Sequence, residues 1–299
     1  MNKLLKILLI NIVCILLLIL ISEIVSFKFL NKTDPNFHYV FRAEKFDEIY
    51  SSEYIKDPVL WFRPIEKGKK DKTILLFGCC MTHGLHQVHN KVDKIAHQGW
   101  LSYILNQYTD MTVINRGISG WGLQHMYYQL THPDFITDIK EKPDYVVYTI
   151  IRDHYRRLFS NSSANEPYYL MYERKGDELV RKKDSILNRS LTVYVAKQAY
   201  CREHFDASIV NFYLLKSYEK MKEINPNVKF IILDMDGIPE LYQSNVLKDN
   251  GIKLIDLTKY SDGYNIHCPE MKKYWGDDFA HPSSKYWHFI IPNILNEFN

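Results

Sequence analysis

Two adjacent cysteines follow a short apolar run in the first third of the chain, and the second has the chemistry of a nucleophile. The run TILLFG ends at Gly78 and is followed by Cys79 and Cys80. A cysteine thiolate attacks carbonyl carbon atoms, and its free pKa of about 8.5 falls when a histidine lies beside it. Cysteine is also a small apolar side chain that fills cores, which we expect for Cys79 and which is the alternative for Cys80.

A carboxylate and an imidazole stand close together near the C-terminus, in Asp278-Phe279-Ala280-His281-Pro282. A carboxylate that accepts a hydrogen bond from an imidazole orients the ring, whose second nitrogen then takes a proton. Asp278 and His281 therefore have the spacing of a general base and its orienting residue. The alternative is that His281 only caps the helix that Pro282 begins.

Two further segments place glycine, amide or charged residues after predicted strands. They are Asn115-Arg116-Gly117-Ile118-Ser119-Gly120 and Arg152-Asp153-His154. Reactive groups in open α/β sheets gather at the carboxyl ends of the strands, so we expect these segments to lie at the same edge as Cys80. The alternative for Gly120 is a turn residue, because Ser-Gly-Trp-Gly is typical of turns.

The elements that must position these residues form a repeating pattern of strand and helix. Apolar runs predict strands at 73–78, 111–115, 145–151, 230–235 and 253–257, and helical stretches are predicted at about 97–107, 121–132, 192–224 and 285–298, the last kinked by Pro292. Strands separated by helices indicate βαβ units and a mostly parallel sheet. The fold class is therefore α/β.

The segment from about 155 to 190 interrupts this pattern. YYLMYER and ELVRKK flank Lys175-Gly176-Asp177, which predicts an inserted β-hairpin. We expect one α/β domain over residues 73–299 that contains this insertion, and a linker over residues 27–72 that precedes it.

The N-terminus carries an apolar segment with the length of a membrane helix. Ile7 to Ser22 contains no charged residue, and Lys3 and Lys6 precede it. We expect residues 1–26 to form a cytoplasmic tip and an uncleaved transmembrane anchor, because no small-x-small cleavage pattern follows. The positive-inside rule then places the domain in the periplasm or outside the cell. A cleaved signal peptide is the alternative.

Composition excludes several other classes of protein. The chain has 299 residues and a net charge of only +3, which is too small for the basic field of a nucleic-acid-binding protein. Its five cysteines contain no Cys-x-x-Cys pair, so neither a zinc module nor a dense disulfide framework fits. Cys79, Cys80, His83 and His86 make a poor metal site, because adjacent cysteines chelate zinc awkwardly. Cys201 and Cys268 remain candidates for a disulfide outside the cytoplasm.

The four segments described above, which contain Cys80, Gly120, Asp153 and His281, form four blocks. Together these blocks resemble the SGNH (GDSL-type) hydrolase superfamily in residue type and order over about residues 73–298. The resemblance implies a flavodoxin-like three-layer α/β/α fold. It places Cys80 where the family has its nucleophilic Ser, Gly120 on the oxyanion-hole Gly, Asp153 on the oxyanion-hole Asn, and Asp278 with His281 on the final block. It implies a Cys-His-Asp triad and an oxyanion hole formed by backbone N–H groups of Cys80 and Gly120.

Two positions depart from the family pattern. Cys80 replaces Ser, which keeps a competent nucleophile, and Asp153 replaces Asn. An ionised Asp153 repels an oxyanion, so either it is protonated, or Arg152 or His154 donates in its place, or Asp153 organises Arg156 or Arg157.

The function implied is a membrane-anchored esterase or O-acyltransferase that needs no cofactor or metal. Its expected partners are an acylated small molecule, glycan or lipid, and the membrane itself through the N-terminal helix. The alternative is a catalytically inactive SGNH-like domain that binds a glycan or an envelope protein.

Overall fold

The computed structural model of the chain describes residues 3–33, 65–83, 101–118, 120–132, 142–159, 170–182, 191–265, 268–274 and 281–298. Its centre is a five-stranded sheet in which all pairings are parallel. The strands are β1 (Lys70–Phe77), β2 (Met111–Asn115), β3 (Tyr145–Ile150), β6 (Lys229–Asp234) and β7 (Ile252–Asp256), arranged β2-β1-β3-β6-β7. This is the 2-1-3-4-5 order of flavodoxin-like sheets. The predicted fold class is confirmed.

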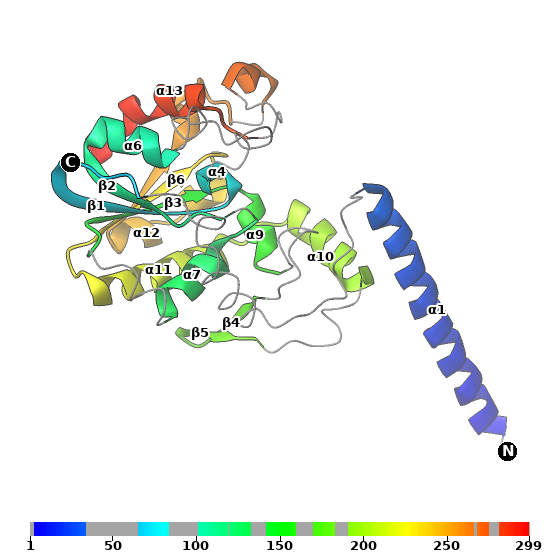
Figure 1. Cartoon of the computed structure of the whole chain (residues 1–299). Helices are drawn as coiled ribbons and strands as arrows, with labels where there is room; N and C mark the ends of the chain where they lie inside the picture. The colour runs from blue at the N-terminus through cyan, green and yellow to red at the C-terminus, as the bar shows by residue number, and fades with distance from the viewer. Residues whose placement is uncertain are drawn as a thin grey trace.

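Helices cover both faces of this sheet, as Figure 1 shows. Side chains of β1 alternate between the two faces: Ile74 and Leu76 pack with α6 (Leu101–Thr109) and α13 (Ser284–Ile294), whereas Leu75 and Phe77 pack with α7 (Leu123–Thr131) and α11 (Ala207–Ile224). Strands covered on both faces must be apolar throughout, and β2 and β3 are buried at every residue. The domain therefore has two cores separated by the sheet.

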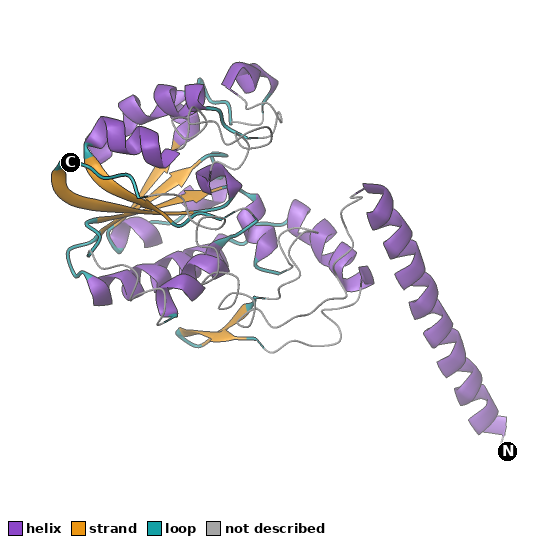
Figure 2. Cartoon of the chain, viewed as in Figure 1, coloured by secondary structure: helices purple, strands orange, loops and turns teal. Residues whose placement is uncertain are grey.

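The other helices and strands of the domain complete the chain around this sheet. They are α4 (Cys80–His83), α9 (Asp153–Arg157), β4 (Tyr172–Lys175), β5 (Glu178–Arg181), α10 (Leu191–Glu203) and α12 (Val246–Asp249), with 3-10 turns at Pro239–Tyr242, Leu257–Tyr260, Pro269–Tyr274 and Leu295–Phe298. Strands β4 and β5 pair antiparallel apart from the main sheet (Figure 2), so the predicted hairpin is confirmed.

Two predicted helices differ in detail from the structure. The stretch at 192–224 is two helices, because the Asp206 side chain accepts a hydrogen bond from the Ser208 N–H at 2.8 Å and caps a new helix, α11. At the C-terminus, α13 continues through Pro292 to Ile294 and then tightens into the 3-10 turn.

Strand β1 begins at Lys70, earlier than predicted, with three exposed residues.

The N-terminal segment is a single helix, α1 (Lys3–Thr33). Residues Lys6–Ser26 have a mean hydropathy of 3.0 and are not buried within the protein, so this helix is long and apolar enough to cross a membrane. Near the end of this span, the Thr192 hydroxyl at the start of α10 donates to Ser22 at 3.2 Å and lies 3.3 Å from the Ser26 hydroxyl. The apolar helix thus contacts the domain through α10 (Figure 1).

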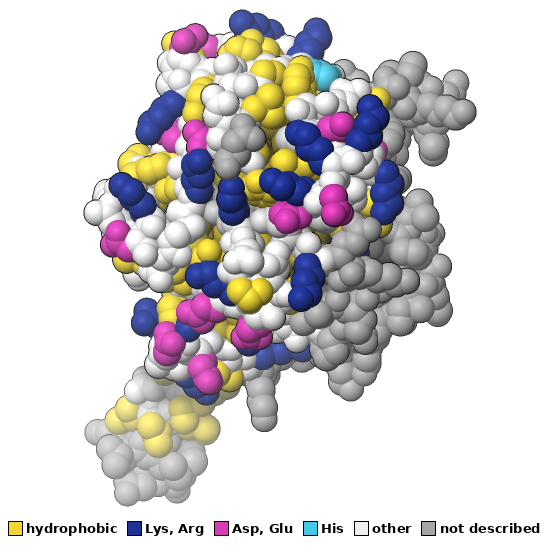
Figure 3. Space-filling model, turned by 90° about the vertical axis from the view of Figure 1, so that its left-hand side faces the viewer, with side chains coloured by type: hydrophobic (Ala, Val, Ile, Leu, Met, Phe, Trp, Pro, Cys, Tyr) yellow, Lys and Arg dark blue, Asp and Glu magenta, His cyan; other side chains and the backbone are white. Residues whose placement is uncertain are grey.

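Charges on the domain surface are mixed in sign. On the face in Figure 3, Lys and Arg side chains are interspersed with Asp and Glu. This distribution accompanies the small net charge of +3.

Candidate active site

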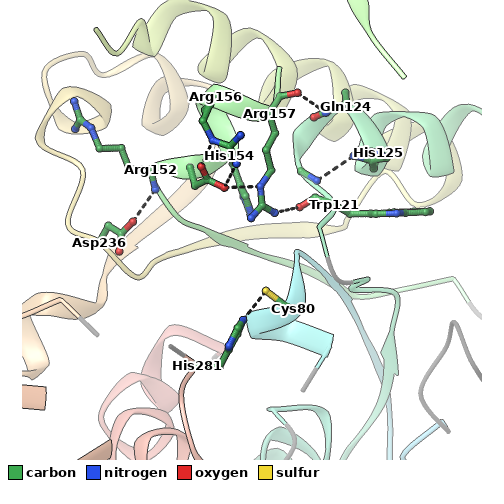
Figure 4. Close-up of polar contacts among 12 residues, drawn as sticks. Cys80, Trp121, Gln124, His125, Arg152, His154, Arg156, Arg157, Asp236 and His281 are labelled. Carbon is green, nitrogen blue, oxygen red and sulfur yellow. Dashed lines mark hydrogen bonds and ion pairs between the residues drawn. The ribbon is translucent and has the colours of Figure 1, made fainter. Parts of the chain in front are cut away.

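Cys80 and His281 meet at the carboxyl edge of the sheet. Cys80 begins α4 directly after β1, and His281 lies just before Pro282 and α13. The Nε2 atom of His281 is 2.8 Å from the Sγ atom of Cys80 (Figure 4). Cys80 is half-buried and packs against the core on one face of the sheet. The structure therefore brings a predicted nucleophile and a predicted base into hydrogen-bonding contact.

A sharp turn at Gly78 places Cys80 in this position. Gly78 has a φ of +152°, and a Cβ atom there would collide with the hydroxyl groups of Thr82 and Thr149. The N–H groups of Thr82 and His83 donate to the Cys79 carbonyl at 3.0 and 2.9 Å, which starts α4 at once. Only glycine fits this strand-to-helix turn.

The loop after β2 is attached to the same turn. Asn115 donates from Nδ2 to the Thr82 carbonyl at 2.9 Å, and the Ile118 N–H donates to the Gly78 carbonyl at 3.1 Å. Gly120 follows with a left-handed φ of 81°, and its N–H hydrogen-bonds to Cys80 and lowers the pKa of that thiol. The predicted oxyanion donor Gly120 thus points at the predicted nucleophile.

The neighbouring thiol of Cys79 controls the protonation of Cys80. Cys79 is completely buried in the core, as predicted. Its hydrogen bond with Cys80, together with burial, raises the pKa of Cys80 well above the usual range, against the lowering effects of Arg157 and the Gly120 N–H. Cys80 is therefore a thiol at neutral pH, and the His281 imidazole lies beside its sulfur.

Asp153 is an acceptor for two arginines. Its carboxylate accepts hydrogen bonds from Arg156 and, at 2.7 Å, from Nε of Arg157. Burial raises the pKa of Asp153, but the hydrogen bonds and charges of both arginines outweigh burial and hold that pKa below its usual value. Asp153 is thus ionised and has no side-chain proton to give an oxyanion. Of the three alternatives for this residue, the structure shows the one in which it organises Arg156 and Arg157.

Arg157 connects Asp153 to the Gly120 loop. Its Nη1 atom donates to the Trp121 carbonyl at 2.7 Å, and its own carbonyl accepts from Gln124 Nε2 at 2.7 Å (Figure 4). The residue is only 7% exposed. Its charge acts on the thiols of both Cys79 and Cys80.

His125 holds the far end of this loop. Its Nδ1 accepts the Gly122 N–H at 3.1 Å, and its ring stacks on Trp121 with centroids 4.9 Å apart. Burial, and then the charges of Arg157 and His154, lower the pKa of His125 from 6.5 to about 3. The ring is therefore neutral, as an acceptor must be.

The two neighbours of Asp153 in sequence have other contacts. His154 is completely buried, with Nδ1 2.7 Å from the Tyr148 hydroxyl, and its ring acts on Cys79. Arg152 donates to both carboxylate oxygens of Glu240, at 3.0 and 2.7 Å, and from its N–H to Asp236 at 2.7 Å. Neither side chain is directed at the Cys80 sulfur by these contacts.

The remaining predicted residues are placed as follows. Asp278 and Ser119 lie outside the described residues, as does His86. Cys201 and Cys268 are free thiols that pack on opposite cores of the sheet, so they are not bridged. Within the described part of the chain, no group of three or more His, Cys, Asp or Glu side chains is placed to hold a metal ion.

Sequence reasoning missed the contact of Arg157 with Trp121 and the roles of Gln124 and His125. The only available signal was the spacing of Asp153 and Arg157, which are four residues apart and share a helix face. A main-chain acceptor such as the Trp121 carbonyl leaves no trace in residue type.

Comparison with known proteins finds similar chain paths but no close relative. No family model and no curated protein matches the chain. Similar solved structures include a protein from Desulfitobacterium hafniense described as a lipolytic protein of the G-D-S-L family (12% identity, 74% of this chain and 95% of that chain, TM-score 0.41). Others are an α/β hydrolase from the metagenome of Lake Arreo, Spain (15%, 76% and 94%, 0.42) and a catalytic mutant of an acetylxylan esterase from Geobacillus stearothermophilus (15%, 78% and 97%, 0.40). TM-scores below 0.5 assign no function.

Proposed function

We propose that the protein is an SGNH-type esterase or O-acyltransferase that uses Cys80 as its nucleophile. The observation that carries this proposal is the 2.8 Å contact between Cys80 Sγ and His281 Nε2, beside the Gly120 N–H, at the carboxyl edge of a parallel sheet. A nucleophile in contact with a base, with a backbone donor aimed at the same point, is the arrangement that acyl transfer requires.

The first half of the reaction forms a thioester. His281 Nε2 takes the proton from Cys80, and the sulfur attacks the carbonyl carbon of an ester. The oxyanion accepts hydrogen bonds from the N–H groups of Cys80 and Gly120. The intermediate then expels the alcohol, which takes the proton back from His281. Asp278 is proposed to orient the imidazole during both transfers.

In the second half of the reaction, the group that attacks the thioester determines whether the result is hydrolysis or acyl transfer. His281 takes a proton from a water molecule or from a sugar hydroxyl, whose oxygen attacks the thioester carbonyl. The sulfur of Cys80 leaves and recovers a proton from His281. Water gives a carboxylic acid, and a sugar gives a new O-acyl ester.

The apolar helix α1 bears on where the protein acts and on which class of substrate it meets. We propose that α1 is an uncleaved anchor with a cytoplasmic N-terminus and that the domain acts outside the cytoplasm on O-acyl groups of envelope glycans or lipids. The apolar length of Lys6–Ser26 and its lack of burial support the anchor. Fractionation and external protease treatment test it: we expect membrane-bound protein whose domain is cleaved only from outside. Soluble protein that starts after residue 26 would show a cleaved signal peptide instead.

Hydrolysis of p-nitrophenyl acetate by the full chain in detergent micelles tests the chemistry. We expect turnover by wild type, background rates for Cys80→Ala and His281→Ala, and unchanged turnover for Cys268→Ala, which removes a free thiol on the same core. Background rates in every protein would contradict the esterase and favour a binding domain.

A further inference from the structure

Arg157 lies at the point where three parts of the site meet. Its guanidinium donates to Asp153 within α9 and to the carbonyl of Trp121 in the loop after β2. The same group acts electrostatically on Cys79 and Cys80, which follow β1. It is a buried cation, and Asp153 supplies the matching negative charge.

Trp121 closes the turn that presents Gly120. The Trp121 N–H donates to the Ile118 carbonyl at 3.1 Å, and Gly120 stands between them with a φ of 81°. The Ile118 N–H fixes the start of this turn to Gly78, and the bond from Arg157 fixes its end. These two hydrogen bonds hold both ends of the turn that carries the Gly120 N–H.

The planar guanidinium suits this place better than an ammonium group. It donates in two fixed directions at once, to the Asp153 carboxylate from Nε and to the Trp121 carbonyl from Nη1. A lysine keeps the charge but lacks the rigid fork. Arg157 therefore combines a geometric contribution and an electrostatic one, which substitutions can separate.

We propose that Arg157 is a positioning residue of this site: held by Asp153, it fixes the Trp121 carbonyl so that the Gly120 N–H stays aimed at the reacting centre, and its charge favours the negative charge that forms there. This inference rests on the proposed ester chemistry. At the position where an oxyanion-hole Asn is expected, the chain has the ionised carboxylate of Asp153, which acts on the site through the Arg157 cation.

Two Arg157 variants of the full chain in micelles test the inference, with Arg156→Gln as the matched control. Arg156 donates to the same Asp153 carboxylate, whereas Arg157 also donates to the Trp121 carbonyl. For Arg157→Lys and Arg157→Gln we expect kcat on p-nitrophenyl acetate to fall about 100-fold with KM within about threefold, the size of effect seen when one oxyanion donor is lost. Arg156→Gln is expected to stay within about threefold of wild type.

The pH dependence of Cys80 alkylation by iodoacetamide gives a second readout that a purely structural role would not move. Among the described residues, the titratable groups that act on Cys80 are Cys79, His281 and Arg157. Loss of the positive charge in Arg157→Gln should shift the alkylation midpoint to higher pH, whereas Arg157→Lys should keep it near that of wild type.

The outcomes separate this inference from the proposed function. Cys80-dependent turnover in wild type, together with kcat within threefold of wild type in both Arg157 variants, would overturn the inference and leave the function intact. Without Cys80-dependent turnover in wild type, the function fails, and an unshifted alkylation profile in Arg157→Gln then overturns the inference as well. If Arg157→Gln does not fold, Asp153→Asn replaces it, with an expected loss of about tenfold in kcat because Arg157 loses its charged partner.

Discussion

Cys79 and Cys80 share a hydrogen bond between their side chains, although one thiol is completely buried and the other is half-buried next to His281. The chain turns sharply just before these two residues, between the end of β1 and the start of α4. Gly78 permits this turn, and as a result one thiol belongs to the core and the other to the site.

Replacement of Cys79 by Ala should make Cys80 more acidic. The hydrogen bond that the Cys80 thiol donates to Cys79 is the largest cause of the raised pKa of Cys80, so its removal lowers that pKa. The rate of iodoacetamide alkylation of Cys80 should therefore reach half its maximum at a lower pH than in wild type. Cys201→Ala, which alters a buried thiol in the opposite core, serves as the control. A midpoint that is unchanged or higher would contradict the coupling of the two thiols.

Substitution of His125 should change how stability depends on pH. The folded protein holds the pKa of His125 at about 3, below the usual value of 6.5. Between these two pH values the unfolded chain binds a proton on His125 and the folded protein does not. The contribution of His125 is complete above pH 6.5 and is lost as pH falls toward 3, by about 1.4 kcal/mol per pH unit. Gln accepts the Gly122 N–H without titrating. Urea unfolding of wild type and His125→Gln should therefore give free energies that converge above about pH 7 and diverge on acidification. Parallel curves would count against a neutral buried His125.

Asp234 at the end of β6 should be important for stability. Its buried carboxylate accepts three backbone N–H groups, from Asp236 at 3.1 Å, Gly237 at 3.0 Å and Ile238 at 2.7 Å. Asp234→Ala leaves these donors without their acceptor, and the Ile238 N–H is buried, so we expect a loss of about 3 kcal/mol in the free energy of unfolding. Asp234→Asn, which keeps an acceptor oxygen, should lose about half as much. Equal stabilities of wild type and Asp234→Ala would show that water replaces the carboxylate.

Two glycines with positive φ offer a matched pair for testing the turn before Cys80. Gly78→Ala combines an unfavourable φ with a clash against Thr82 and Thr149, whereas Gly176→Ala in the hairpin has a φ of 62° and open space around it. We expect Gly78→Ala to lower the free energy of unfolding by at least about 2 kcal/mol and to abolish turnover, and Gly176→Ala to cost about 1 kcal/mol with full activity. Similar effects of both substitutions would mean that close packing at Gly78 is unimportant.

The sequence predicts the sheet well, because strands such as Val146 to Ile150 are buried on both faces and therefore read as unbroken apolar runs. It also predicts that Cys80 and His281 belong to one site, through their places in the four blocks. It does not determine which partner Asp153 has, because an aspartate is equally able to be a protonated donor or an ionised acceptor paired with an arginine. The bond from Arg157 to Trp121 escapes prediction for another reason: any residue supplies a carbonyl. The bond also depends on how α9 packs beside the loop after β2, which is a feature of the tertiary structure.

The most direct test of the central claim is mass spectrometry of the acyl-enzyme after rapid mixing of the full chain with p-nitrophenyl acetate and acid quenching. The account predicts an acetyl group on the peptide that contains Cys80, linked as a hydroxylamine-labile thioester, which appears at the rate of p-nitrophenol release and is lost in Cys80→Ala and His281→Ala. Acetylation at any other residue with the same kinetics, or turnover that leaves Cys80 unmodified throughout, would contradict it.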